Sequence, residues 1–126
     1  MSHLVLDAGA LIAFERGDAK VRLYLAAADR MSVDLTTTSP VVSQVWRDGR
    51  RQALLARLLR AVRVDAPDEV AARRAGELLA KAGTADVVDA LLVGLASDGD
   101  TILTSDPDDI DNLVAAAGVR AVIVTV

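Results

Sequence analysis

Two acidic residues stand where an α/β protein usually gathers its chemistry. Asp7 directly follows the apolar run 3–6, and Asp106 comes shortly after the apolar run 102–104. Both runs are predicted to be strands. In an open α/β sheet, ligands bind beyond the carboxyl ends of the strands, near the point where the strand order reverses. If these two strands are neighbours, both carboxylates face the same crevice.

A further acidic pair lies between these two positions in the sequence. Asp86 and Asp89 are three residues apart at the start of a predicted apolar helix over residues 86–97. This spacing places both carboxylates on one helix face near the N-terminus of the helix. Asp89 lies one turn inside that helix, where an unpaired charge is costly. Three separate segments could therefore deliver acids to one place.

Carboxylates that are packed together repel each other, and their pKa values rise unless a cation joins them. Mg²⁺ or Mn²⁺ is the natural cation, because both ions prefer oxygen ligands. Such an ion can lower the pKa of a bound water, orient it toward a phosphodiester and stabilise the leaving oxygen. The chain has no cysteine, and His3 is its only histidine. These counts exclude a disulfide framework, a cysteine nucleophile and a multi-histidine metal site, so a carboxylate–metal site is the leading interpretation.

Each of these acids also has a purely structural interpretation. Asp106 can cap the helix that begins after it, with Asp109 adding favourable charge in the first turn. We expect this capping whatever else Asp106 does. Asp86 can equally be a helix cap. Asp108 and Asp111 are predicted to be solvated surface residues.

The composition indicates one folded domain. The chain has 126 residues, and we expect a single domain over residues 1–126. Hydrophobic residues make up 52% but aromatic residues only 2%, so the core must consist of Ala, Val, Leu and Ile.

No apolar run could span a bilayer, and the N-terminus lacks a signal pattern. We therefore expect a cytoplasmic protein without membrane contact. The net charge of −4 excludes a wholly basic nucleic-acid binder but permits a local basic patch.

Short apolar runs alternate with helical patterns along the whole chain. This alternation predicts an α/β protein with a parallel sheet that is covered on both faces. The predicted strands are residues 3–6, 31–35, 62–64, 102–104 and 119–126. Four predicted helices cover residues 11–14, 19–28, 54–59 and 86–97. Three more are predicted to begin at Ser39-Pro40, at Pro67 and at Pro107.

Three segments together resemble the motifs of PIN-domain nucleases. Residues 7–13, Asp-Ala-Gly-Ala-Leu-Ile-Ala, resemble the opening motif, an acid followed by a small or hydroxylated residue and an apolar helix. Residues 89–96 are similar to the central acid-plus-helix motif, and Thr104-Ser105-Asp106 resembles the late T-x-D motif. Order, spacing and length fit over essentially the whole chain. The resemblance implies a PIN-like α/β/α sandwich with a roughly five-stranded parallel sheet.

Within this family, a lone small domain most resembles the VapC-type toxins of bacterial toxin–antitoxin pairs. That resemblance implies RNA cleavage with Mg²⁺ or Mn²⁺, a homodimer and a small VapB-type antitoxin as partner. It implies a catalytic set and a metal-ligand set that overlap. The catalytic set is Asp7, Asp89, Asp106 and Gln44, and the metal-ligand set is Asp7, Asp86, Asp89 and Asp106.

One position departs from the family pattern. PIN nucleases usually carry a Glu on the helix after the second strand, and Gln44 occupies that place here. An amide can coordinate through its carbonyl oxygen but brings no negative charge. Asp48 or Glu15 could supply the missing charge, and Asp86 beside Asp89 could compensate for it. The alternative function is a catalytically weakened PIN-like domain that binds RNA or a partner.

A stretch rich in arginine follows Gln44. Arg47, Arg50 and Arg51 could bind RNA phosphates, with Trp46 near enough to stack on a base. The alternative is a solvated face in which the arginine stems cover apolar surface and Trp46 lies in the core.

Overall fold

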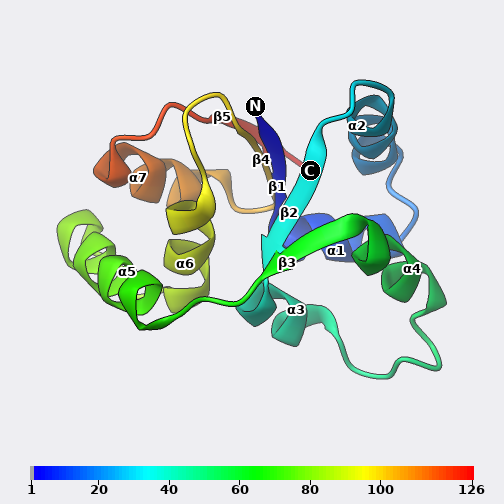
Figure 1. Ribbon diagram of the computed structural model, residues 1–126, viewed down its shortest axis with the longest axis horizontal. Coiled ribbons are helices and arrows are strands. Elements are labelled where there is room, and N and C mark those ends of the chain that lie inside the picture. The colour runs from blue at the N-terminus through cyan, green and yellow to red at the C-terminus, as the bar shows by residue number, and fades with distance from the viewer. Residues whose placement is uncertain (1) are drawn as a thin grey trace.

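The computed structural model describes residues 2–126 (Figure 1). Within this range the chain forms five strands and seven helices, with one or two helices between consecutive strands. In chain order they are β1 (His3–Leu6), α1 (Ala8–Glu15), α2 (Ala19–Arg30), β2 (Asp34–Thr38), α3 (Ser39–Val45), α4 (Ala53–Ala61), β3 (Val62–Asp65), α5 (Glu69–Ala82), α6 (Val87–Leu95), β4 (Thr101–Thr104), α7 (Pro107–Ala117) and β5 (Val122–Thr125).

The five strands form one parallel sheet in the order β3-β2-β1-β4-β5. Strand β1 lies in the middle, where Leu4 is paired with Leu35 of β2 on one side and with Thr101 of β4 on the other. All four strand pairs are parallel, which confirms the predicted parallel α/β sheet. The strand order reverses between β1 and β4. The residues that follow these two strands therefore emerge side by side at the carboxyl edge of the sheet.

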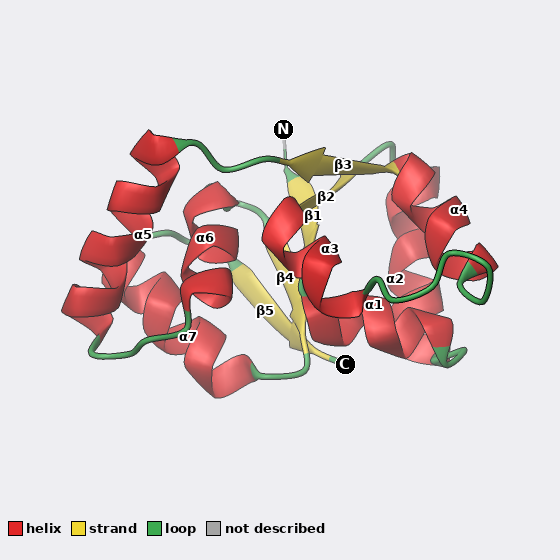
Figure 2. Cartoon of the chain, turned by 90° about the horizontal axis from the view of Figure 1, so that it is seen from below, coloured by secondary structure: helices red, strands yellow, loops and turns green. Residues whose placement is uncertain are grey.

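Helices cover both faces of the sheet (Figures 1 and 2). Helices α1, α2 and α4 pack together on one side, and α5, α6 and α7 pack together on the other. Helix α3 continues directly from β2 and contacts both α1 and α6. It therefore lies at the carboxyl edge of the sheet, between the two helical layers.

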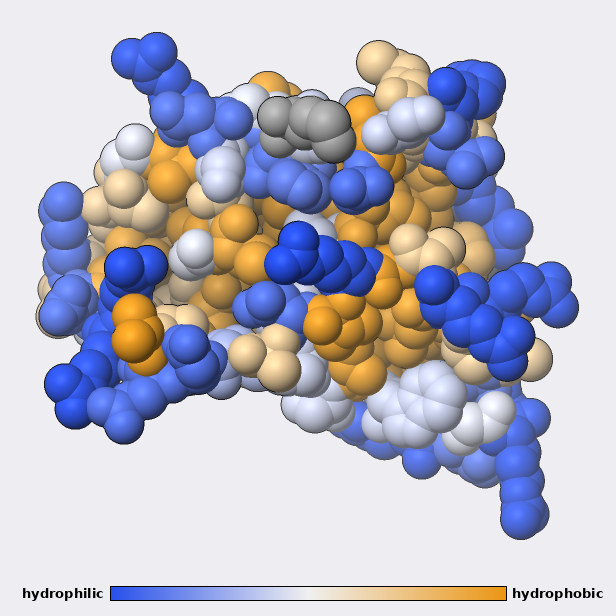
Figure 3. All heavy atoms as spheres, viewed as in Figure 1, coloured by the Kyte–Doolittle hydropathy of each residue, from blue (hydrophilic) through white to orange (hydrophobic). Residues whose placement is uncertain are grey.

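The core is aliphatic, as the composition predicts. Val5 in β1, Ile102 in β4 and Leu92 in α6 are fully buried. The chain's only tryptophan, Trp46, is 38% exposed. In the space-filling view, hydrophobic residues gather toward the middle of the visible face while hydrophilic residues project around its outline (Figure 3). Among the described residues, no helix combines the length and the apolar character that crossing a bilayer requires.

The second strand lies later in the sequence than predicted. The apolar run 31–35 suggests a strand, but β2 begins at Asp34 and extends through three buried threonines. Ser32 has a positive φ of 54° and ends the turn after α2, so the residues before Asp34 cannot continue a strand. The threonines fit inside because their hydroxyls are satisfied: Thr37 Oγ1 donates to the Leu6 carbonyl at 2.6 Å.

Smaller differences concern the ends of elements. Helix α5 begins at Glu69 rather than Pro67, because Asp68 caps it by accepting from the Ala71 N–H. Helix α6 ends at Leu95 and not at residue 97. Strand β5 covers only Val122–Thr125 of the predicted run 119–126. Gly118, with a positive φ of 70°, ends α7 directly before residue 119, and the first residues of the run belong to the loop that follows.

Candidate metal centre

Asp7 is a buried carboxyl group held from two sides. It caps α1 by accepting from the Ala10 N–H at 2.8 Å, and it is 5% exposed. It also accepts hydrogen bonds from the backbone of Gly9 and Ser105 and from the side chain of Thr104. Burial raises the pKa of Asp7, and these four hydrogen bonds oppose that rise. Asp7 therefore connects the start of α1 to the turn between β4 and α7.

The hydroxyl of Thr104 joins two of the acidic segments. Thr104 ends β4 and is fully buried. Its Oγ1 accepts from the Asp106 N–H at 2.9 Å, and its side chain is hydrogen-bonded to Asp7. One hydroxyl group thus fixes the backbone of Asp106 relative to the carboxyl group of Asp7.

Asp106 and Asp109 lie at the start of α7. Asp106 occupies the N-cap position, as the sequence predicts, but its side chain makes no capping hydrogen bond. Its carboxyl group instead forms a hydrogen bond with that of Asp109, and this bond raises the pKa of Asp106. Both residues are exposed. The Asp106 oxygens therefore face other carboxylates and are not used by the helix terminus.

Asp89 approaches the same place from α6. It is half-buried in the first turn, and its backbone N–H donates to Asp86 Oδ1 at 3.0 Å. Burial is the main reason that the pKa of Asp89 rises to about 7. The charges of Asp86, Asp7, Asp106 and Asp109 add to that rise, in this order. Among the acidic side chains of this region, Asp89 therefore has the most strongly shifted pKa.

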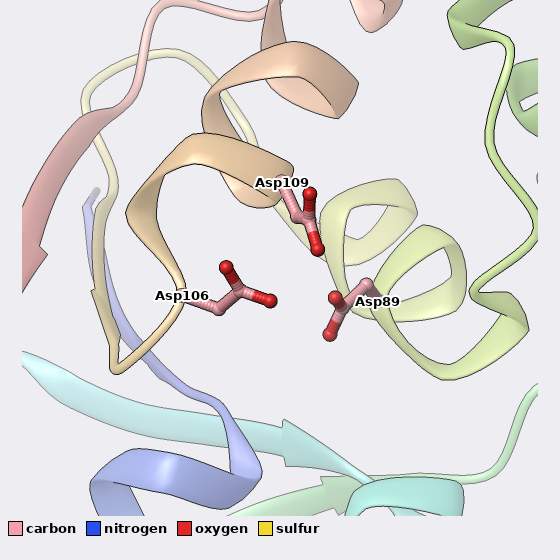
Figure 4. Close-up of side chains that lie close together, drawn as sticks. All are labelled: Asp89, Asp106 and Asp109. Atoms are coloured by element: carbon pink, nitrogen blue, oxygen red, sulfur yellow. The ribbon is translucent and has the colours of Figure 1, made fainter.

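Three carboxylates meet in the space between α6 and α7 (Figure 4). Asp89, Asp106 and Asp109 each place one oxygen within 4.8 Å of the other two. Asp89 and Asp106 are predicted ligands, whereas the sequence reasoning treats Asp109 only as a first-turn charge. The spacing of three from Asp106 at a helix start is the signal that could have found it, because the same spacing singles out Asp86 and Asp89.

Two of the predicted ligands lie outside this three-oxygen cluster. Asp7 is close enough for its charge to raise the pKa values of Asp89 and Asp106, but its oxygens are held by the hydrogen bonds described above. Asp86 is exposed and caps α6. Asp7 and Asp86 thus surround the cluster and bind the backbone of the segments that form it.

The donor set of the cluster suits a hard divalent cation. Oxygens bound to one Mg²⁺ lie about 2.1 Å from it and hence no more than about 4.2 Å apart. The three oxygens, which lie within 4.8 Å of one another, would need to draw together only slightly. Carboxylate oxygens are the ligands that Mg²⁺ and Mn²⁺ prefer. The pKa values of Asp89 and Asp106 are both raised, and the charges of neighbouring carboxylates contribute to each rise.

The residues considered for the fourth acidic position lie elsewhere. Gln44 is exposed on α3. Glu15, at the end of α1, accepts from Gln52 Nε2 at 3.3 Å through both of its oxygens. Asp48 accepts from the Arg50 N–H at 3.0 Å. Neither Glu15 nor Asp48 belongs to the three-oxygen cluster.

The arginine-rich stretch forms an exposed loop between α3 and α4. Trp46 is 38% exposed rather than buried in the core, and a Cβ on Gly49 would lie 2.9 Å from its Cζ2 atom. Arg47 Nη1 donates to the carbonyls of Ser43 and Trp46, at 2.9 and 2.8 Å. Arg50 and Arg51 are exposed. Both ribbon views place this loop on the opposite side of α3 from α6 and α7.

The chain is thus an α/β protein with a parallel sheet and with acidic residues at the carboxyl ends of two neighbouring strands, β1 and β4. The PIN domain family matches residues 4–115, and the chain belongs to that family. A similar fold occurs in the crystal structure of VapBC2 from Rickettsia felis bound to a DNA fragment from their promoter. The TM-score is 0.66 at 13% sequence identity, over 100% of this chain and 99% of that chain. No curated protein matches the sequence significantly.

Proposed function

We propose that the chain is a metal-dependent endoribonuclease toxin of the VapC type, which cleaves RNA phosphodiesters with Mg²⁺ or Mn²⁺ and a water molecule. The observation that carries this proposal is the cluster of Asp89, Asp106 and Asp109 at the carboxyl edge of a PIN domain. The likeness of the whole fold to a chain of a VapBC2 complex supports a toxin role. On the same basis we propose a VapB-type antitoxin as partner, a homodimer and a cytoplasmic location.

In this proposal the three clustered carboxylates hold the ion. An ion bound there would supply the positive charge that activates a water molecule and stabilises the charge on the scissile phosphate. Asp86 fixes the first turn of α6 through its hydrogen bond to the Asp89 N–H, and thereby orients Asp89. Asp7 adds negative charge next to the cluster and holds the β4–α7 turn in place. Asp7 and Asp86 thus act on the centre from its periphery.

The arginine loop is proposed as the RNA-binding surface. The exposure of Arg50, Arg51 and Trp46 supports this role, because phosphates and bases can reach all three. Arg47 would contribute through the guanidinium nitrogens that do not bind the α3 carbonyls. An RNA strand that contacts both the loop and the cluster passes along α3, where Gln44 is exposed.

The test is cleavage of a structured RNA pool by the purified protein in Mg²⁺, Mn²⁺ or EDTA, beside three variants. We expect metal-dependent cuts in the wild type, and we expect their loss in Asp7→Asn and Asp89→Asn with an unchanged circular dichroism spectrum. Asp111→Asn is the matched control, because Asp111 is exposed on α7 outside the cluster. Equal cleavage in EDTA, or unchanged Mn²⁺ binding in both Asp7→Asn and Asp89→Asn, would contradict the proposal.

The presence of Gln44 supports a second candidate function, that of a weakened PIN domain that binds RNA or a partner without efficient cleavage. An amide at this position lacks the charge of the usual Glu. If this position is a ligand, Gln44→Glu raises both Mn²⁺ affinity and cleavage. If Gln44→Glu has no effect and Asp48→Asn inactivates the protein, Asp48 and not residue 44 supplies the fourth acidic group. RNA binding without cleavage in the wild type, together with cleavage by Gln44→Glu, would favour the second candidate.

A further inference from the structure

Gly9 and Ser105 lie in unusually close contact. Gly9 is in the first turn of α1, and Ser105 is in the turn between β4 and α7. A Cβ added to Gly9 would overlap Ser105 Oγ, lie 2.5 Å from Ser105 Cβ and lie 3.1 Å from Ser105 N. Rotation of the serine side chain moves Oγ but leaves Cβ in place. A residue larger than glycine at position 9 therefore forces the backbone of the turn away from α1.

Backbone conformation does not explain why glycine stands here. The glycines with positive φ are Gly17, Gly83, Gly99 and Gly118, and Gly9 is not among them. In the interior of a helix, alanine is more favourable than glycine. Position 9 thus runs against the helix preference of α1, and what glycine provides there is space.

That space lets two segments bind the same carboxyl group. Asp7 accepts from Gly9 and Ala10 of α1, and also from Thr104 and Ser105 of the β4–α7 turn. Both sets of donors can reach Asp7 only while nothing separates α1 from the turn. Because Asp106 is the next residue after Ser105, a displacement of the turn also displaces Asp106.

We propose that Gly9 is a positioning residue for the metal centre: its missing side chain lets the Thr104–Asp106 turn dock against α1, and this docking sets where Asp106 meets Asp89 and Asp109. The inference rests on the proposed function, because it assigns Gly9 a role in the metal site of that function. Gly9 itself touches neither the ion nor the substrate. Its effect passes through Ser105 and the hydrogen bonds of Asp7.

The primary test is Gly9→Ala, with Mn²⁺ affinity and RNA cleavage as readouts. We expect a folded protein whose Mn²⁺ affinity falls about 10- to 100-fold, as is typical when the partners that orient metal ligands are disturbed. Gly94→Ala is the matched control. Gly94 lies in α6, the helix that carries Asp89, and a Cβ there meets nothing within 4 Å. We expect wild-type affinity in this control, and wild-type affinity in Gly9→Ala would overturn the inference.

A rescue experiment identifies the contact itself. Ser105→Gly removes both side-chain atoms that a Cβ on residue 9 would meet. We expect the double variant Gly9→Ala/Ser105→Gly to regain most of the lost Mn²⁺ affinity. If Gly9→Ala alone does not fold, the double variant should fold and bind Mn²⁺ like the wild type. A folded double variant that still binds Mn²⁺ as weakly as Gly9→Ala, or does not bind it, would contradict a role through Ser105.

A metal-free measurement separates this inference from the proposed function. In the structure the backbone N–H groups of Gly9 and Ser105 both bind Asp7. Their hydrogen exchange should be slow in the wild type and in the double variant, and faster in Gly9→Ala. A wild type that neither binds Mn²⁺ nor cleaves RNA contradicts the proposed function alone. Unchanged protection of Ser105 in Gly9→Ala contradicts the contact, whatever the protein's activity.

Discussion

The carboxyl groups of Asp106 and Asp109 are joined by a hydrogen bond across the first turn of α7. Two carboxyl groups can form such a bond only when one of them carries a proton, and the bond therefore raises the pKa of Asp106. A cation that binds between them must displace that proton. In the proposed function this contact would link metal binding to pH, and it would give Asp109 a part that its first-turn position alone does not reveal.

Replacement of Asp109 tests that part. Asp109→Asn removes one of the three clustered oxygens as an anionic ligand, and we expect Mn²⁺ affinity to fall about tenfold or more. Asp108→Asn changes the neighbouring acid by the same chemistry, but Asp108 is not in the cluster. Isothermal titration with Mn²⁺ compares the two variants. Equal affinities would exclude Asp109 from the site.

Metal binding should strengthen as the pH rises. Asp89 has a pKa of about 7, and burial is the main cause of this high value. Because only the ionised carboxylate binds a cation, a proton must leave before the ion can enter. We expect Mn²⁺ affinity to rise roughly tenfold per pH unit below pH 7, and to level off above it. Titrations at pH 5.5, 6.5 and 8 would show this, and an affinity independent of pH would contradict it.

The stability of the metal-free protein should show the opposite trend. The pKa of Asp89 is higher in the folded chain than its ordinary value of 3.8, so the native state binds more protons than the unfolded state between pH 4 and about 7. The free energy of unfolding therefore falls as the pH rises through this window. Asp89→Asn removes the effect. We expect this variant to gain about 1–2 kcal/mol over the wild type at pH 8, after allowance for the partial exposure of Asp89, and little at pH 4.

Urea unfolding in EDTA at the two pH values measures this difference. Asp111→Asn serves as the control because Asp111 is exposed and lies outside the cluster. A gain for Asp89→Asn that is the same at pH 4 and pH 8 would exclude the electrostatic cause.

The hydroxyl of Thr104 should be needed for both stability and metal binding. Thr104→Val keeps the shape of the side chain but leaves the Asp106 N–H without its acceptor and Asp7 without a donor. Loss of a partner for buried groups costs about 1–3 kcal/mol, and the pKa of Asp7 should rise further. Thermal unfolding and Mn²⁺ titration measure the two effects. Thr101→Val, on the same strand, should leave Mn²⁺ affinity unchanged.

Much of the fold can be predicted from the sequence because its strands are short, apolar and bounded by helix starts. The rule that ligands bind at the carboxyl edge leads directly to Asp7 and Asp106, since β1 and β4 are neighbours. The order of the strands is not visible in the sequence itself. The second strand is misplaced because the apolar run 31–35 hides the left-handed turn at Ser32, and because buried threonines resemble a polar segment.

The details of the centre depend on tertiary contacts. The pKa of Asp89 is the sum of burial and four neighbouring charges that come from three segments. The missing capping bond of Asp106 follows from its interaction with Asp109, which local rules for helix ends do not include. The need for glycine at position 9 depends on Ser105, which is far away in the sequence. No local pattern carries this information.

The central place of β1 between β2 and β4 also determines when the centre can form during synthesis. Strand β1 is close in the sequence to β2 and can pair with it early, but its other edge pairs with β4, which follows much later in the sequence. Pairing between such distant segments is slow and comes late in folding. Until then Asp7 lacks the donors of Thr104 and Ser105, and Asp89 lacks Asp106 and Asp109. The three-oxygen cluster is therefore complete only when β4 and α7 have docked.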